Sequence, residues 1–260
     1  MANGICVYAE SYNGELETVA AELVSAAKGL AETTKEKVQA IVLSDHAEEL
    51  VKELDKLGVD EIYAVKADHD ITLQDDAVSA AIAEMLKKIE PSAVLVPATP
   101  QGRSVFSRVA MRLGCGMTAD CTEVLAAQRE DGSFYIKQNK PSYGENVFVT
   151  ILTKEGIYPQ MMTVRPGVYA ACEAKESGNA NVTFFDDIKI VDLPGIYAMD
   201  TYSNEEIVSK NFLLNEDVDI ILNIVDASNI DRNLYLTTQR NLLRKSEEQS
   251  EEQDQWLIQR

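Results

Sequence analysis

The first half of the chain alternates short apolar runs with longer segments of helical period, and this alternation constrains the fold more than any other feature. Strands buried on both faces form continuous apolar runs, and parallel neighbours need a crossover helix between them. The pattern predicts a Rossmann-like α/β fold with a parallel sheet. Strands are expected at 5–9, 38–43, 61–65 and 93–96, and helices at 16–31, 47–57, 75–89 and 102–113.

After Gly116 the pattern changes to strands without long helices, which predicts added antiparallel strands. These are expected at 121–126, 134–138, 147–152 and 160–164, with glycines at 132, 144 and 156 in the turns. The pattern then restarts, with a strand at 188–192, a helix at 203–214, a strand at 219–226 and a polar helix from about 230. We expect a first domain at 1–175, a linker at 176–187, a partial α/β segment at 188–240 and a polar helical tail at 241–260.

The charge balance excludes several classes of partner. The chain has 24 Lys and Arg against 43 Asp and Glu, a formal net charge of −19. A strongly negative protein repels phosphate backbones and anionic lipids, so neither nucleic acid nor a membrane surface is an expected partner. No stretch approaches the ~20 apolar residues of a membrane span, and the start does not read as a signal peptide. We expect a cytoplasmic protein.

The cysteines do not suggest a metal site. Cys6, Cys115, Cys121 and Cys172 form no C-x-x-C pair, and the chain has only two histidines. Zinc sites need closely spaced thiolate and imidazole ligands. The sequence therefore predicts no bound metal.

The segment from Pro97 to Arg108 runs from a buried strand directly into a helix. At such a position, free backbone N–H groups can face an anion. Gly102, Arg103 and Ser104 are therefore candidates for facing a phosphate or a flavin, with Arg165 as a second positive group. The alternative is an ordinary capped turn, with Arg103 in a surface ion pair and Arg165 in a structural one, since no G-x-G-x-x-G motif is present.

No catalytic arrangement accompanies these residues. Neither histidine lies near them in the sequence, and Asp120 or Cys121 alone makes no catalytic triad. Independent catalysis is not expected.

Three motifs carry a resemblance to a known family: GRSVFSRVAMRLGCGMTADCT at 102–122, PSYGEN at 141–146 and PQMMTVRPGVY at 159–169. They resemble the N-terminal domain of the electron transfer flavoprotein alpha subunit, over about residues 3–175. The resemblance implies a heterodimer with a beta subunit that carries electrons from flavin dehydrogenases. In that family FAD is held chiefly by a further alpha-subunit domain, whose motif contains a histidine. Both histidines here precede residue 70, so we expect FAD only at the level of the heterodimer.

Residues 188–239 carry a second resemblance, to the GTPase domain of the ferrous iron transporter B family. It rests on IVDLPGIY at 190–197 and DIILNIVDASNIDRNLYLTTQ at 219–239. Asp192 and Gly195 match the Asp-x-x-Gly motif that meets magnesium and phosphate in that family. None of the 13 glycines is followed by lysine, so the G-x-x-x-x-G-K-[ST] loop is missing and the motif is expected to be non-functional.

Three readings of the chain stay open. The first is an alpha-type domain that docks a beta subunit in a flavin electron carrier, with Arg103, Arg108 and Arg112 on its partner surface. The second is a guanine-nucleotide-binding regulator that acts through the Asp192 segment. The third is a non-functional fusion of two gene fragments, since the resemblance changes abruptly near residue 185.

Overall fold

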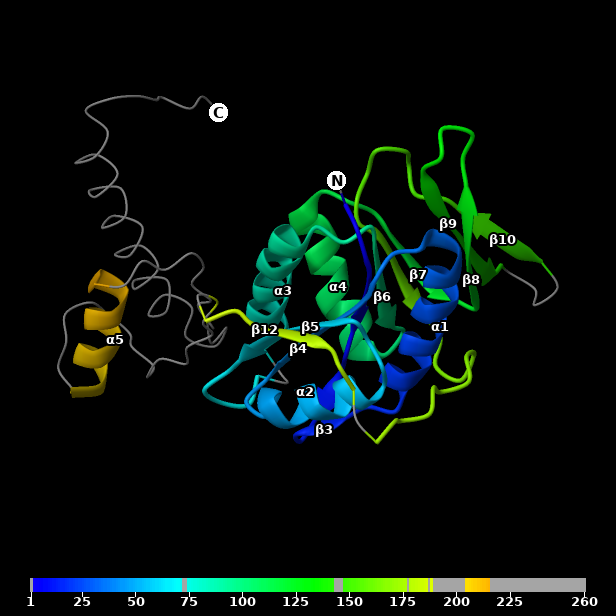
Figure 1. The fold of residues 1–260 in the computed structure, drawn as a ribbon. Helices are drawn as coiled ribbons and strands as arrows, with labels where there is room; N and C mark the ends of the chain where they lie inside the picture. Colours follow the sequence, from blue (N-terminus) through cyan, green and yellow to red (C-terminus); the bar gives the residue numbers. More distant parts are fainter. Residues whose placement is uncertain are drawn as a thin grey trace, which may run out of the picture. The chain divides into compact units, whose positions relative to one another are not determined.

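A seven-stranded, wholly parallel sheet forms the centre of the first of two units, Met1–Val191 and Asp192–Arg260 (Figure 1). The computed structural model describes residues 2–71, 74–142, 147–176, 178–186, 188 and 204–215. The sheet has the order β12-β5-β4-β1-β6-β11-β7. Its strands are β1 (Ile5–Tyr8), β4 (Val38–Ser44), β5 (Glu61–Lys66), β6 (Ala93–Pro97), β7 (Met117–Cys121), β11 (Gln160–Val164) and β12 (Asn181–Phe184). Every strand pair in this sheet is parallel.

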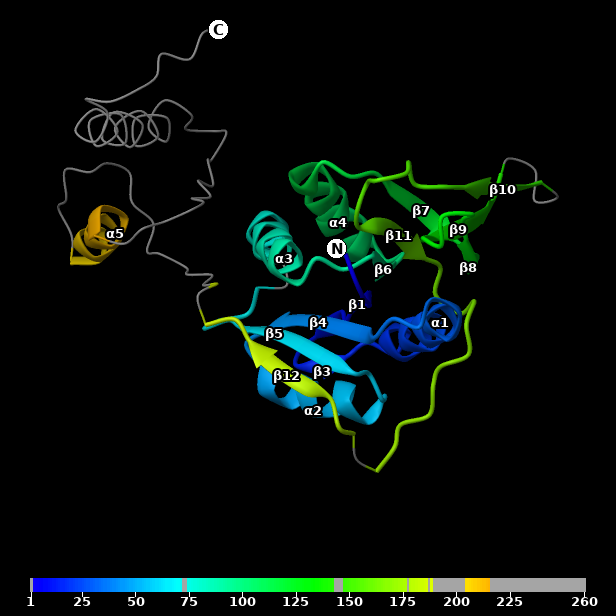
Figure 2. The same cartoon turned by 45° about the horizontal axis from the view of Figure 1, so that its top comes forward.

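Four helices cover the two faces of this sheet (Figure 2). They are α1 (Val19–Thr34), α2 (Ala47–Lys56), α3 (Asp75–Ile89) and α4 (Pro100–Leu113). Side chains alternate between the two faces of a strand: Ile5 and Val7 of β1 join the core under α1 and α2, whereas Cys6 and Tyr8 join the core under α3 and α4. The sheet is therefore buried on both sides, as its continuous apolar strands require.

The predicted α/β fold with added antiparallel strands is confirmed. The antiparallel part is a three-stranded sheet made of β8 (Glu123–Gln128), β9 (Phe134–Pro141) and β10 (Phe148–Ile151), in the order β10-β9-β8. It lies at one end of the first unit, with β10 on the outside (Figure 2). We call it the antiparallel arm.

A two-stranded hairpin replaces the expected start of the first helix. Strands β2 (Ser11–Tyr12) and β3 (Glu15–Leu16) flank Asn13 and Gly14, both of which have positive φ. Asn-Gly with positive φ at both central residues is typical of a tight hairpin turn. The helix therefore begins at Val19 rather than Leu16.

The expectation of a linker at 176–187 is wrong, because these residues include an edge strand of the parallel sheet. Strand β12 pairs with β5 over Asn181 to Phe184. Just before it, the Ala180 N–H donates to Asp55 Oδ1 at 2.8 Å. The polar composition of this segment reflects its place at an exposed edge, where a strand buries few side chains.

Other boundaries also differ from the expectation. In place of the single strand expected at 121–126, the structure has two strands, β7 and β8, which belong to different sheets. The strand at 160–164 is parallel and central, as β11 between β6 and β7. In the second unit the structure describes one helix, α5 (Asn204–Asn215), close to the expected 203–214. The strands expected at 188–192 and 219–226 and the helix from 230 lie outside the described residues, apart from Ile188.

Candidate functional site

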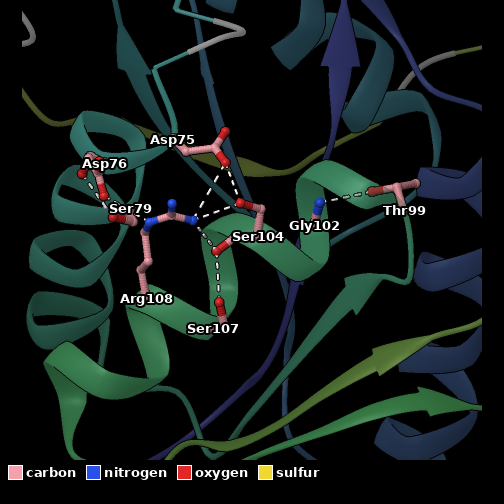
Figure 3. A network of polar contacts seen from close by, with 8 residues as sticks. All are labelled: Asp75, Asp76, Ser79, Thr99, Gly102, Ser104, Ser107 and Arg108. Atoms are coloured by element: carbon pink, nitrogen blue, oxygen red, sulfur yellow. Dashed lines mark hydrogen bonds and ion pairs between the residues drawn. The ribbon is translucent and has the colours of Figure 1, made fainter. Parts of the chain in front are cut away.

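The α4 start is a tightly closed helix cap (Figure 3). Thr99 is the N-cap residue: its Oγ1 accepts a hydrogen bond from the Gly102 N–H at 2.9 Å, and its carbonyl accepts one from the Arg103 N–H at 3.0 Å. The Thr99 hydroxyl in turn donates to Glu10 Oε2 at 2.7 Å. Pro100 follows at the first helical position, which suits its fixed φ. The N–H groups of Gly102 and Arg103 are therefore already engaged within the cap.

Ser104 belongs to a polar network that joins α3 to α4 (Figure 3). Its hydroxyl donates to the Asp75 carboxylate. Arg108 donates to Ser104 Oγ at 2.7 Å and pairs through Nε with Asp76 Oδ1 at 2.8 Å. Both acidic residues lie in the first turn of α3, where the helix dipole stabilises negative charge. Ser104 and Arg108 thus hold two helices together, and neither faces an open ligand site.

Arg103 and Arg165 meet at one carboxylate, that of Asp120. Arg165 makes a two-pronged contact, with Nε 3.2 Å from Oδ1 and a terminal nitrogen 2.6 Å from Oδ2. Arg103 reaches Oδ1 more loosely, at 3.5 Å. Asp120 has φ of 66°, an uncommon backbone conformation, and its N–H donates to Thr163 Oγ1 at 2.8 Å. The hydrogen bond from Arg165 lowers the pKa of Asp120 below its usual range.

Replacing Asp120 with Asn is expected to destabilise the protein at pH 7, by about 0.5 to 1 kcal/mol because solvent screens the half-exposed pair. A lowered folded-state pKa means that the stabilisation is present above the unfolded pKa of about 3.9 and is lost as the pH falls through the folded value. The difference between variant and parent should therefore shrink at pH 3. Urea unfolding at pH 7 and pH 3 measures the free energy of unfolding of variant and parent. Glu53→Gln is the control, because it makes the same carboxylate-to-amide change at an exposed position of α2. An equal loss at both pH values would contradict the ion-pair explanation.

The structure brings together only part of the set predicted to face a flavin. Arg103 and Arg165 converge on Asp120, as the ion-pair alternative expected. Gly102 is buried in the first turn of α4, and Ser104 faces α3. Asp192 and Gly195 lie outside the described residues. Sequence reasoning set Asp120 aside, and nothing local in the sequence signals its positive φ or its two arginine partners.

The antiparallel arm is notable for its exposed apolar side chains. All four residues of β10 are exposed, and Phe148 is 67% exposed. Neighbouring exposed apolar residues on or beside the arm are Leu125, Val147, Val149, Ile151, Leu152 and Tyr158. Among the described strands, β10 pairs only with β9, so its outer edge carries unpaired backbone groups. Apolar side chains gathered at an open strand edge mark a surface that another protein can cover.

Three of the cysteines, Cys6, Cys115 and Cys121, are poorly suited to form a reactive thiolate. Burial raises the pKa of Cys6 and of Cys115, and it raises the pKa of Cys121 to about 11. Thiols with raised pKa values stay protonated at neutral pH and are poor nucleophiles. Among the described residues, no group of three or more His, Cys, Asp or Glu side chains is arranged to hold a metal ion. The same part of the chain has no helix with the length and apolar character needed to cross a membrane.

Two protein families match the chain. The model of the electron transfer flavoprotein domain matches residues 5–189, and that of ferrous iron transport protein B matches residues 147–246. The two ranges overlap between 147 and 189. About half of the second range lies outside the described residues, and its described part falls largely within the overlap, so the fold bears mainly on the first match.

Curated relatives agree with the first match. An electron transfer flavoprotein subunit alpha of Thermoanaerobacterium thermosaccharolyticum is 34% identical over 70% of this chain and 54% of its own length. The lactate dehydrogenase (NAD(+),ferredoxin) subunit LctC of Acetobacterium woodii is 30% identical, over 78% of this chain and 47% of its own. An electron transfer flavoprotein subunit alpha of Megasphaera elsdenii is 30% identical, over 86% of this chain and 72% of its own.

The chain thus spans about half the length of most of these relatives. The matched residues 5–189 coincide with the unit that contains the parallel sheet, the helix cap at Thr99 and the antiparallel arm. The chain belongs to the electron transfer flavoprotein family.

Proposed function

We propose that this chain is the alpha-type domain of a flavin electron carrier and that it docks a beta-type subunit through the antiparallel arm. The observation that carries the proposal is β10, an edge strand with all four residues exposed and mostly apolar. Family membership supports the electron-transfer role, and relatives are named as alpha subunits of such carriers. The test is binding of a beta subunit by the intact chain and by arm variants.

The local charge also favours the arm as the docking surface. Residues 117–169 carry five Lys or Arg and six Asp or Glu, so this part is nearly neutral in a chain of net charge −19. Protein interfaces are depleted of charge at their centre and enriched in aromatic residues. A second copy of the chain would bring two strongly negative molecules together, which long-range repulsion opposes. A different protein, the beta-type subunit, is therefore the proposed occupant.

The basic residues of α4 are weaker candidates for the partner surface than the sequence suggested. Arg108 is engaged by Asp75 and Asp76 within the chain, and Arg103 lies near Asp120. Of the three arginines, Arg112 alone has no ion pair in the described part of the chain; it is exposed in the last turn of α4. We therefore centre the proposed interface on β10, with Arg112 outside it.

Flavin belongs to the family, and a bound flavin would supply the one- and two-electron chemistry of such a carrier. The described residues of this chain do not form a cradle for it, because Thr99 occupies the N–H groups of Gly102 and Arg103 and Asp75 occupies the Ser104 hydroxyl. We propose that FAD is held only in the assembled carrier. Arg103 and Arg165 stay proposed as its nearest positive groups, since both side chains are about half exposed.

The chain purified alone is expected to retain no FAD. Incubation with excess FAD followed by desalting should leave a colourless protein, because the start of α4, where the flavin-binding candidates lie, is already capped. Absorbance near the flavin bands measures the bound fraction, and an intact alpha and beta heterodimer of the family serves as the positive control. Stoichiometric yellow protein would contradict the proposed division of roles.

The guanine-nucleotide alternative is not favoured. The chain has no phosphate-cradling G-x-x-x-x-G-K-[ST] loop. A cytoplasmic setting stays part of the proposal.

A further inference from the structure

The chain contains two Asn-Gly dipeptides, Asn3-Gly4 and Asn13-Gly14. An asparagine followed by glycine can lose ammonia without an enzyme, because the next backbone nitrogen attacks the side-chain carbonyl carbon and glycine has no Cβ to hinder it. In a folded protein the backbone must also move into the geometry of attack. The two dipeptides have the same chemistry, so the structure around each decides which of them reacts.

Asn13 and Gly14 form the turn of the β2–β3 hairpin, where little holds them in place. Asn13 is exposed, and in the described chain no hydrogen bond engages its side-chain amide or the Gly14 N–H. The hairpin is a separate two-stranded sheet with only two residue pairs. So short a hairpin opens locally at little cost. Asn13 can therefore leave its left-handed conformation, with φ of 52°, and reach the geometry of attack.

The backbone around Asn3 is held at the start of the central strand β1. The Asn3 N–H donates to the Glu90 carbonyl at 3.0 Å, and the Gly4 carbonyl accepts from the Ser92 N–H at 2.9 Å and from its hydroxyl at 3.0 Å. Gly4 is buried, and the Gln39 side chain lies where a Cβ would stand. Movement here would disturb a strand that pairs with β4 and β6, so this dipeptide is expected to react only when the unit unfolds.

We propose that Asn13 is a site of spontaneous deamidation and that the fold protects Asn3. The Gly14 nitrogen forms a bond to Cγ of Asn13, the bond from Cγ to the amide nitrogen breaks, and ammonia leaves with the proton that the Gly14 nitrogen gives up. Water then opens the cyclic imide at either carbonyl, which leaves aspartate or isoaspartate at position 13. The reaction consumes only water, and it is independent of the docking of a beta subunit.

The product would change a cleft at the carboxyl ends of β1 and β4. The cleft has a volume of about 290 Å³, and its lining includes Tyr8, Asn13, Gly14 and His46. Deamidation places a carboxylate in this lining where a neutral amide stood. Isoaspartate also adds an atom to the backbone of a two-residue turn, whose length sets the register of the hairpin. The modification therefore alters both the charge of the cleft and the hairpin that contributes to its lining.

Incubation of the full chain in mildly alkaline buffer, followed by peptide mass spectrometry, tests the proposal. Proteolysis after Glu10 separates the two dipeptides, so the mass gain of about one dalton is measured for each. In the folded chain Asn13 is expected to convert at least about tenfold faster than Asn3, because only its reaction proceeds by local opening. In guanidinium chloride the two rates should approach each other, since both dipeptides are then free to move.

Asn13→Gln is the matched substitution, because glutamine would have to form a larger ring and does so far more slowly. It should abolish conversion at position 13 and leave the rate at Asn3 unchanged. Equal rates at Asn3 and Asn13 in the folded chain would overturn the proposal. So would an unmodified Asn13 in the folded chain at a time when the unfolded chain has reacted.

Discussion

Replacing Gly102 with Ala is expected to destabilise the sheet-containing unit by about 2 to 4 kcal/mol, as for overpacking against a rigid neighbour. A Cβ at Gly102 would lie 2.2 Å from the Pro97 carbonyl oxygen and 3.0 Å from Thr99 Oγ1. The first of these is backbone at the end of a buried central strand, so it cannot move aside cheaply. The substitution would therefore push α4 away from β6 and weaken the cap at Thr99.

Thermal unfolding followed by far-ultraviolet circular dichroism measures this effect. The single tryptophan, Trp256, comes long after the last strand of the sheet in the sequence, so its fluorescence is a poor reporter. Gly29→Ala in α1 is the matched control, because nothing lies within 4 Å of a Cβ built there. Both glycines are helical, and helix propensity alone favours alanine by about 1 kcal/mol. Gly29→Ala should thus raise the melting temperature slightly. A similar rise for Gly102→Ala would show that the contact with the Pro97 carbonyl oxygen does not destabilise the variant, and would contradict the prediction.

The parallel sheet and its helices could be predicted from the sequence because their signals are local. Apolar runs predicted β1, β4, β5 and β6. Helical periodicity predicted the four helices that cover the sheet, α1 to α4, to within a few residues of their bounds. The hairpin at Asn13 and Gly14 had a readable signal as well, since Asn-Gly is a strong turn dipeptide. Its strands are only two residues long, too short for an alternating pattern to show.

Other features depend on contacts between distant segments, which no local pattern records. Strand β12 pairs with β5 about 120 residues earlier in the chain, and its four residues are mainly exposed. The contact of Asp120 with Arg165 depends on β7 and β11 lying side by side with a register shift. The cleft at Tyr8 is assembled from the ends of several strands and from the β2–β3 hairpin. For these reasons the candidate residues at 102–104 were found from sequence, whereas their hydrogen-bond partners were not.

Exchanging Phe148 for Ser is expected to weaken binding of a beta-type subunit at least thirtyfold, while the free chain keeps its stability to within about 0.5 kcal/mol. Phe148 is 67% exposed in β10, so its removal costs little in the isolated chain. In a complex that covers the arm, the same ring would be buried at the centre of the interface. Aromatic residues in that position commonly contribute about 2 kcal/mol or more to binding.

Met111→Ser on α4 is the matched control, since Met111 is also a large exposed apolar residue, 81% exposed. It lies one residue before Arg112, on the helix whose arginines are the competing candidate for the partner surface. Isothermal titration of a beta subunit of the family into the parent chain and both variants separates the two surfaces. A loss of affinity for Met111→Ser with none for Phe148→Ser would move the interface to α4. The arm is the expected interface because it carries several exposed apolar side chains in the described chain, whereas two of the three α4 arginines have ion pairs there.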